Sequence, residues 1–135
     1  MNKKNIDEIL DSVERAQECI MSLRKTNYQF FLKEKNIDYG VNIDTDYARS
    51  YLLLAVENLL IDRKANQNAA LNCIMNAMVH IKAILNRPDL EFEFAWDADE
   101  AIDFLSCAKR VLLKILKPSK TRRKIYDNIQ RRAHS

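Results

Sequence analysis

Glycine is almost missing from this sequence. Gly40 is the only glycine among 135 residues, and the only prolines are Pro88 and Pro118. Tight turns between β-strands depend on these residue types, so a sheet protein with many hairpins is excluded. The P-loop and the dinucleotide-binding turn each need several glycines to bring backbone amides close to phosphates. Both kinds of nucleotide site are therefore excluded as well.

Residues that ligate metals are scarce and scattered. Structural zinc sites use four Cys or His residues in paired spacing, whereas the three cysteines and two histidines here stand far apart and form no CxxC motif. They are Cys19, Cys73, Cys107, His80 and His134. Neither histidine has a glutamate three residues before it, which excludes the Glu-x-x-His pattern of carboxylate-bridged di-metal bundles. We predict no metal, no cofactor and no catalytic residue, and favour a binding protein over an enzyme.

Long apolar runs are missing too. No uninterrupted run approaches the roughly 18–20 residues needed to cross a bilayer. Acidic residues interrupt residues 1–20, where a signal peptide would place its apolar segment. We expect neither a membrane span nor a signal peptide. The odd number of cysteines, each within a helical pattern, favours free thiols and therefore a reducing, cytoplasmic location.

The residues that are abundant are typical of helices. Apolar residues make up 47% of the chain, which is enough for the core of one domain of this length. Four segments space their apolar residues by three and four, as one face of a helix does. They are residues 5–35, 44–64, 66–87 and 97–117. The sequence predicts an all-α fold, with a four-helix bundle-like domain over residues 1–117.

The second helix has the least polar sequence. Turn-forming residues precede it, and Asp44, Thr45 or Asp46 is expected to cap its first turn. Residues 51–61 contain only two strongly polar side chains, which predicts that this helix is the most buried. Because the link to the third helix is short, these two helices should pack antiparallel.

Residues 88–96 alternate apolar and acidic side chains with a period of two. A strand would need a partner strand, and the chain offers none, so we expect an extended loop that presses its apolar side chains onto the bundle. Those side chains are Leu90, Phe92, Phe94 and Trp96. Asp97, with Glu100 three residues later, is expected to cap the fourth helix.

Positive charge is concentrated at the end of the chain. Residues 109–135 contain ten Lys or Arg and one acid, for a formal charge of +9. Because the whole chain carries +3, the first 108 residues carry −6. Residues 118–135 are predicted to form a separate basic tail that contains a short fifth helix.

Two kinds of partner fit this basic end. Cations of the tail would neutralise phosphates of DNA or RNA, as Arg-rich helices do on structured RNA. Alternatively, the tail would bind a protein, or pair with the acidic body of a second copy in a homodimer. The residues expected to contact nucleic acid or a partner are Lys117, Lys120, Arg122, Arg123, Lys124, Tyr126, Arg131 and Arg132. A solvated tail, or one folded back on its own bundle, is the third possibility.

A protein partner has a second possible interface in the aromatic residues Phe92, Phe94 and Trp96, since large aromatic side chains are frequent at interface hot spots. The sequence therefore favours a small non-catalytic adaptor, inhibitor or regulator that acts through a protein partner. Nucleic-acid binding by the basic C-terminal helix is the alternative.

His80 is the one histidine inside a helical pattern, at the edge of the apolar stripe, and we interpret it as a half-buried packing group with one hydrogen bond. A helical bundle with a catalytic His resembles the HEPN ribonucleases, which carry an Arg a few residues before a His on one helix. Here Arg63 precedes His80 by seventeen residues, while Arg131 and Arg132 stand too close to His134. A HEPN-like bundle, active as a ribonuclease or degenerate, is the weaker alternative.

Overall fold

The computed structural model describes residues 3–34, 39–88, 90–117 and 128–132. Its four long helices are α1 (Lys3–Glu34), α2 (Tyr39–Leu59), α3 (Lys64–Leu85) and α4 (Phe92–Leu116). Residues 128–132 form a short fifth helical segment, and no strand occurs within these described ranges. The predicted all-α bundle is confirmed.

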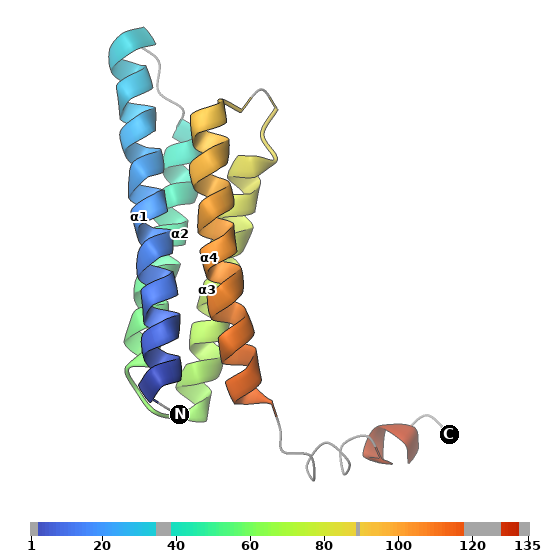
Figure 1. The fold of residues 1–135 in the computed structure, drawn as a ribbon. Coiled ribbons are helices and arrows are strands. Elements are labelled where there is room, and N and C mark those ends of the chain that lie inside the picture. The colour runs from blue at the N-terminus through green and yellow to red at the C-terminus, as the bar shows by residue number, and fades with distance from the viewer. Residues whose placement is uncertain (1–2, 35–38, 89, 118–127, 133–135) are drawn as a thin grey trace.

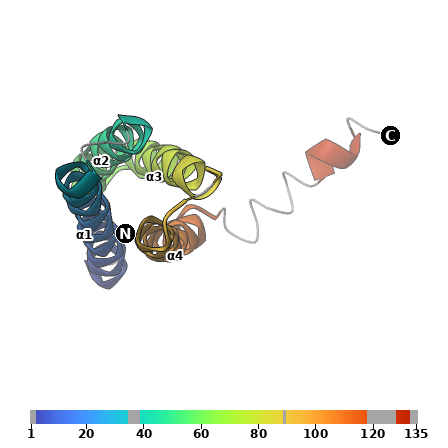
Figure 2. The same cartoon turned by 90° about the horizontal axis from the view of Figure 1, so that it is seen from above.

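The four long helices form a ring in which each one contacts its two neighbours. Successive helices run antiparallel, and the view along the bundle shows them arranged around a common centre (Figures 1 and 2). α1 packs against α2 and α4, and α3 packs against the same two helices from the other side. The antiparallel packing of α2 on α3, expected from their short link, is confirmed.

One stripe of each helix faces the centre of the ring and is closed to solvent. The largest fully buried apolar side chains are Ile9, Val13, Ile20, Leu23, Val41, Leu52, Leu59, Ile74, Ile81, Ile84, Leu105 and Leu112. Burial of each such side chain stabilises the fold by about 1.5–3 kcal/mol. The residues recur at the spacing of three and four that the sequence shows, because only one face of each helix reaches the core.

α2 begins several residues earlier than expected. Val41 and Thr45 are fully buried, on the same face as Ala48, and the Thr45 hydroxyl donates to the Asn42 carbonyl at 3.0 Å within the helix. The prediction that one of residues 44–46 caps the helix is therefore wrong. Burial of this stripe outweighs the preference of the neighbouring Gly, Asn and Asp residues for turns.

Gly40 lies in this added first turn of α2. A Cβ atom at this position would meet the guanidinium group of Arg87, which follows α3. This guanidinium is the far end of a flexible side chain that can move aside, so the only glycine of the chain lies within a helix and does not form a turn.

The expectation that α2 is the most buried helix is wrong. Like every helix of the ring, α2 packs on two neighbours, and its outer side faces solvent. Within the apolar run of residues 51–61, four side chains are exposed: Leu53, Leu54, Leu60 and Ile61. Where almost every residue is apolar, the sequence has no periodicity that separates the buried face of a helix from its exposed face.

α4 also begins earlier than expected, at Phe92, and the predicted extended loop is wrong. Phe94 is only 5% exposed and lies on the buried stripe that continues through Ala98, Ala101 and Leu105. Asp97 lies inside the helix and is not its cap. The steps of four, three and four from Phe94 are those of a helix. Burial of the Phe94 side chain therefore favours a helix over an extended loop at this position.

None of the helices in the part of the chain that the structure describes is long and apolar enough to cross a membrane.

Candidate functional site

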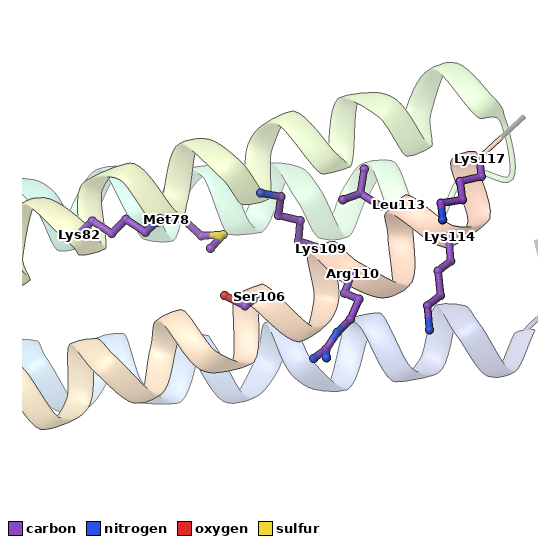
Figure 3. Close-up of a pocket in the computed structure, with 8 residues that line it drawn as sticks. All are labelled: Met78, Lys82, Ser106, Lys109, Arg110, Leu113, Lys114 and Lys117. Atoms are coloured by element: carbon purple, nitrogen blue, oxygen red, sulfur yellow. The ribbon is translucent and has the colours of Figure 1, made fainter. Parts of the chain in front are cut away.

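A groove of about 620 Å³ runs between α3 and the C-terminal half of α4 (Figure 3). It is lined by Met78, Lys82, Ser106, Lys109, Arg110, Leu113, Lys114 and Lys117. Five of these eight residues are cations and none is an acid. Met78 and Leu113 form a small apolar floor, and the cations form the walls of the groove.

Helical spacing places the α4 cations in one arc of the helix surface, with Lys109 at the edge next to α3 and Arg110 and Lys114 at the edge away from it (Figure 3). Lys109, Arg110, Leu113, Lys114 and Lys117 recur at intervals of three and four, which places them along one side of the helix. The buried residues of α4 occupy the opposite side, against the core. Figure 3 shows Lys109 and Leu113 reaching toward α3, whereas Arg110 and Lys114 project from the side of α4 away from α3.

Within the part of the chain that the structure describes, no acidic side chain lines the groove beside its cations. The ion pairs of Asp11 with Arg15, Asp46 with Arg24, and Asp44 with His80 use no cation of the groove. The negative end of the α4 dipole, equivalent to roughly half a charge, offsets only part of the five positive charges. The positive field of the groove is therefore open to an external anion.

The predicted basic residues are placed in part. Lys117 lines the groove, and Arg131 and Arg132 are exposed in the short segment of residues 128–132. The other predicted contacts lie outside the described residues: Lys120, Arg122, Arg123, Lys124 and Tyr126.

Sequence reasoning missed four cations that the structure brings together: Lys82, Lys109, Arg110 and Lys114. The spacing of 110, 114 and 117 was a signal for the α4 cations, since it marks one helical face. Lys82 had no such signal, because its position beside α4 depends on how α3 and α4 pack.

The three aromatic residues predicted as an interface separate into two groups. Phe94 is buried in the core, whereas Phe92 is 71% and Trp96 is 57% exposed. The rings of Phe92 and Trp96 lie one helical turn apart, with centroids 5.9 Å from each other. A shallow groove of about 450 Å³ beside them is completed by Ser22, Thr26, Glu93 and Asp97. The N-terminal end of α4 thus presents exposed aromatic rings among acids.

His80 has the structural environment predicted for it. The ring is partly buried, its Nδ1 lies 3.0 Å from Asp44 Oδ1, and it stacks on Tyr47 and Tyr51. Arg63 precedes the first turn of α3 and lies about 25 Å from His80 along that helix, at 1.5 Å per residue. These two residues therefore do not form the Arg and His pair of a HEPN ribonuclease.

The three cysteines are free thiols on three different helices. Cys19 is buried between α1 and α4, with its Sγ 3.9 Å from Glu100 Oε2. Burial, followed by the negative charge of Glu100, raises the pKa of the Cys19 thiol to about 11. Cys73 has a raised pKa through burial alone. Within the described ranges, no three His, Cys, Asp or Glu side chains come together as a metal site.

Comparison of the chain with models of protein families, with curated proteins and with solved structures found no match.

Proposed function

We propose that this chain is a non-catalytic binding protein whose basic groove between α3 and α4 binds a polyanion, the phosphate backbone of a nucleic acid. The observation that carries the proposal is the set of five cations around one groove without a lining acid. Phosphate contacts from Lys and Arg release counterions from the nucleic acid and supply most of its sequence-independent affinity.

The spacing of the cations favours a polyanion over a single small anion. Along α4, Arg110 and Lys117 lie seven residues apart, which is about 10 Å of helix axis. One phosphate group cannot contact both ends of this row and also Lys82 on α3. A chain of phosphates can contact all of them, and its charges can continue along the basic residues that follow Lys117 in the sequence.

Binding of this kind is expected to read charge rather than base sequence. Cationic side chains that contact phosphates fix position on the nucleic acid but carry no sequence information. The groove offers one hydroxyl, Ser106, and no aromatic ring for base stacking. We therefore expect similar affinities for mixed-sequence RNA and DNA, and a strong dependence on salt.

The experiment is a fluorescence anisotropy titration of the full chain with labelled single-stranded RNA and duplex DNA at 50 mM salt. The test variant carries Lys82→Glu and Lys109→Glu, which reverse two charges in the groove. A matched control carries Lys25→Glu and Lys64→Glu, two exposed lysines outside the groove, and so has the same net charge. We expect the groove variant to bind at least about tenfold more weakly than the control, since each phosphate contact adds to affinity.

Equal affinities of the two variants would contradict the proposal, because net charge alone would then explain binding. Failure of the unaltered chain to bind either nucleic acid at low salt would also contradict the proposal. Circular dichroism and thermal unfolding of both variants establish that they remain folded.

A second candidate function is action through a protein partner, which the sequence favoured. The exposed pair of Phe92 and Trp96 supports it, because apolar rings of this size are usually covered in a soluble protein unless they bind something. The partner would meet an acidic surface there, since Glu93 and Asp97 flank the rings. A cytoplasmic setting is part of both proposals and is supported by the three free thiols.

A further inference from the structure

The exposed side of α4 carries a stripe whose C-terminal half borders the groove with α3 and whose N-terminal aromatic rings border α1. Its members follow the heptad steps of four and three from one end of the helix to the other: Phe92, Trp96, Asp99, Asp103, Ser106, Arg110, Leu113 and Lys117. At 100° per residue they fall within an arc of about 100°. Seven of the eight are exposed, and Ser106 is partly exposed. We call this set the α4 stripe.

The order of the steps in the α4 stripe is the same in both directions. From Phe92 the steps are four, three, four, three, four, three and four, and from Lys117 backward they are identical. A second copy of the helix, turned to run antiparallel, therefore meets the stripe in register, with the two-fold axis between residues 104 and 105. Self-complementarity of this kind is what a two-fold interface requires.

The acids and bases of α4 are separated at the same midpoint of the helix. Residues 92–103 contain five acids and no base, and residues 104–116 contain three bases and no acid, with Lys117 directly after them. An antiparallel partner would place the acidic half of each copy opposite the basic half of the other. A parallel partner would place like charges together, which costs free energy.

We propose that two copies of this chain pair through their α4 stripes as an antiparallel, two-fold symmetric dimer. In that register Asp99 of each copy faces Arg110 of the other, and Asp103 faces Ser106. Trp96 faces Leu113, and Phe92 faces Lys117. The dimer names the partner for the second candidate function and rests on that candidate, whereas the polyanion proposal does not depend on it.

Each of these pairs has a physical reason to form. Asp99 and Asp103 are like charges one turn apart, as are Arg110 and Lys114, so each monomer contains repulsion that a partner of opposite sign relieves. Leu113, which is 42% exposed, gains an apolar neighbour in Trp96. The ammonium of Lys117 can lie over the Phe92 ring, an arrangement that stabilises interfaces when water is excluded.

The apolar face of α2 is the main competing surface. Ile43, Tyr47, Leu54 and Ile61 are exposed along that helix and its end. Nothing in their charge or register selects an occupant, in contrast to the α4 stripe. A variant of Leu54 therefore serves as the control for association through the apolar face of α2.

The dimer is expected to be weak and sensitive to salt. One face of a 25-residue helix is about 37 Å long, which is near the lower size limit of specific interfaces. We expect a dissociation constant on the order of micromolar in low salt, and weaker association as ions screen the exposed charges. Sedimentation equilibrium of the full chain from 1 to 200 µM covers this range.

Charge reversal tests the register directly. Asp99→Arg puts two cations opposite each other in the homodimer, and Arg110→Asp does the same with two acids. Each variant alone is expected to dimerise at least about tenfold more weakly than the unaltered chain. An equimolar mixture of the two variants is expected to recover the dimer, because every reversed position then faces a position of opposite charge.

Recovery in the mixture supports the proposal, and it also shows that both variants are folded. A monomeric unaltered chain at 200 µM in low salt would overturn it, as would a mixture that stays monomeric. Loss of the dimer in Leu54→Glu, with Asp99→Arg unaffected, would overturn it in favour of α2.

Four groove residues, Ser106, Arg110, Leu113 and Lys117, also belong to the α4 stripe, so a polyanion and a second copy would compete for this surface. The groove variant with Lys82→Glu and Lys109→Glu changes no residue of the α4 stripe, and Asp99→Arg changes no residue of the groove. Polyanion binding and dimerisation measured on these two variants therefore separate failure of one proposal from failure of the other.

Discussion

The Nδ1 atom of His80 lies 3.0 Å from Oδ1 of Asp44, so that a side chain of α3 is joined to one of α2. The imidazole also stacks on Tyr47, with ring centroids 4.8 Å apart, and on Tyr51 at 5.9 Å. None of these residues lines the basic groove. The only histidine in the bundle helices therefore fastens two helices together and stands apart from the proposed binding surface.

His80→Ala should reduce stability without changing polyanion affinity. The substitution removes a hydrogen bond to a carboxylate and two ring contacts, so we expect the free energy of unfolding to fall by about 1–3 kcal/mol. Urea denaturation measures this change. His80→Phe keeps the stacking and loses the hydrogen bond, so its free energy of unfolding should lie between those of the unaltered chain and of His80→Ala. A folded His80→Ala variant that no longer binds nucleic acid would show that His80 belongs to the functional site.

Stability should decline in alkaline solution through Cys19. Its thiol has a pKa of about 11 in the folded chain against an ordinary value of 9.0, because burial and Glu100 disfavour the thiolate. Between these two values the unfolded chain loses a proton that the folded chain keeps, so the free energy of unfolding falls as pH rises from about 9 to 11. Denaturation of Cys19→Ala alongside the unaltered chain isolates the effect. Identical pH profiles would show that Cys19 does not contribute.

Leu52 and Leu54 test the assignment of the α2 faces. They stand two positions apart in one apolar run, yet Leu52 is 0% and Leu54 is 47% exposed. Leu52→Ala should cost about 2–5 kcal/mol because it leaves a cavity in the core. Leu54→Ala should change stability by about 0.5 kcal/mol or less. Thermal unfolding of both variants compares them, and equal losses would mean that α2 is rotated relative to the structure.

The sequence predicted the number of long helices because the apolar spacing in α1, α3 and α4 is regular, and it predicted the antiparallel packing of α2 on α3 because their link is short. It failed where burial overrides local preference. Thr45 was expected at a helix end because its hydroxyl can cap backbone amides, but it is fully buried within α2. Phe94 was assigned to a loop by its alternation with acids, and the same ring occupies a helical core position.

The candidate site was predictable only in part. The predicted basic cluster included Lys117, which does line the groove, but not Lys109, Arg110 or Lys114, which precede the predicted tail. Lys82 comes from another helix, and only the packing of α3 on α4 brings it to the site. Phe92 and Trp96 were expected to press on the bundle, and the register of α4 turns both outward. Side-chain direction follows from where a helix begins, and the sequence placed that start five residues late.

The salt dependence of nucleic-acid binding tests the central claim most directly. Observed affinity for duplex DNA is measured from 50 to 200 mM salt for the full chain, for a variant with Lys82→Ala and Lys109→Ala, and for a control with Lys25→Ala and Lys64→Ala. Each phosphate contact contributes roughly −0.9 to the slope of log affinity against log salt. Loss of two groove contacts should therefore make the slope shallower by roughly 1.8, with the control unchanged. Equal slopes in all three proteins would show that the groove between α3 and α4 does not hold the phosphates.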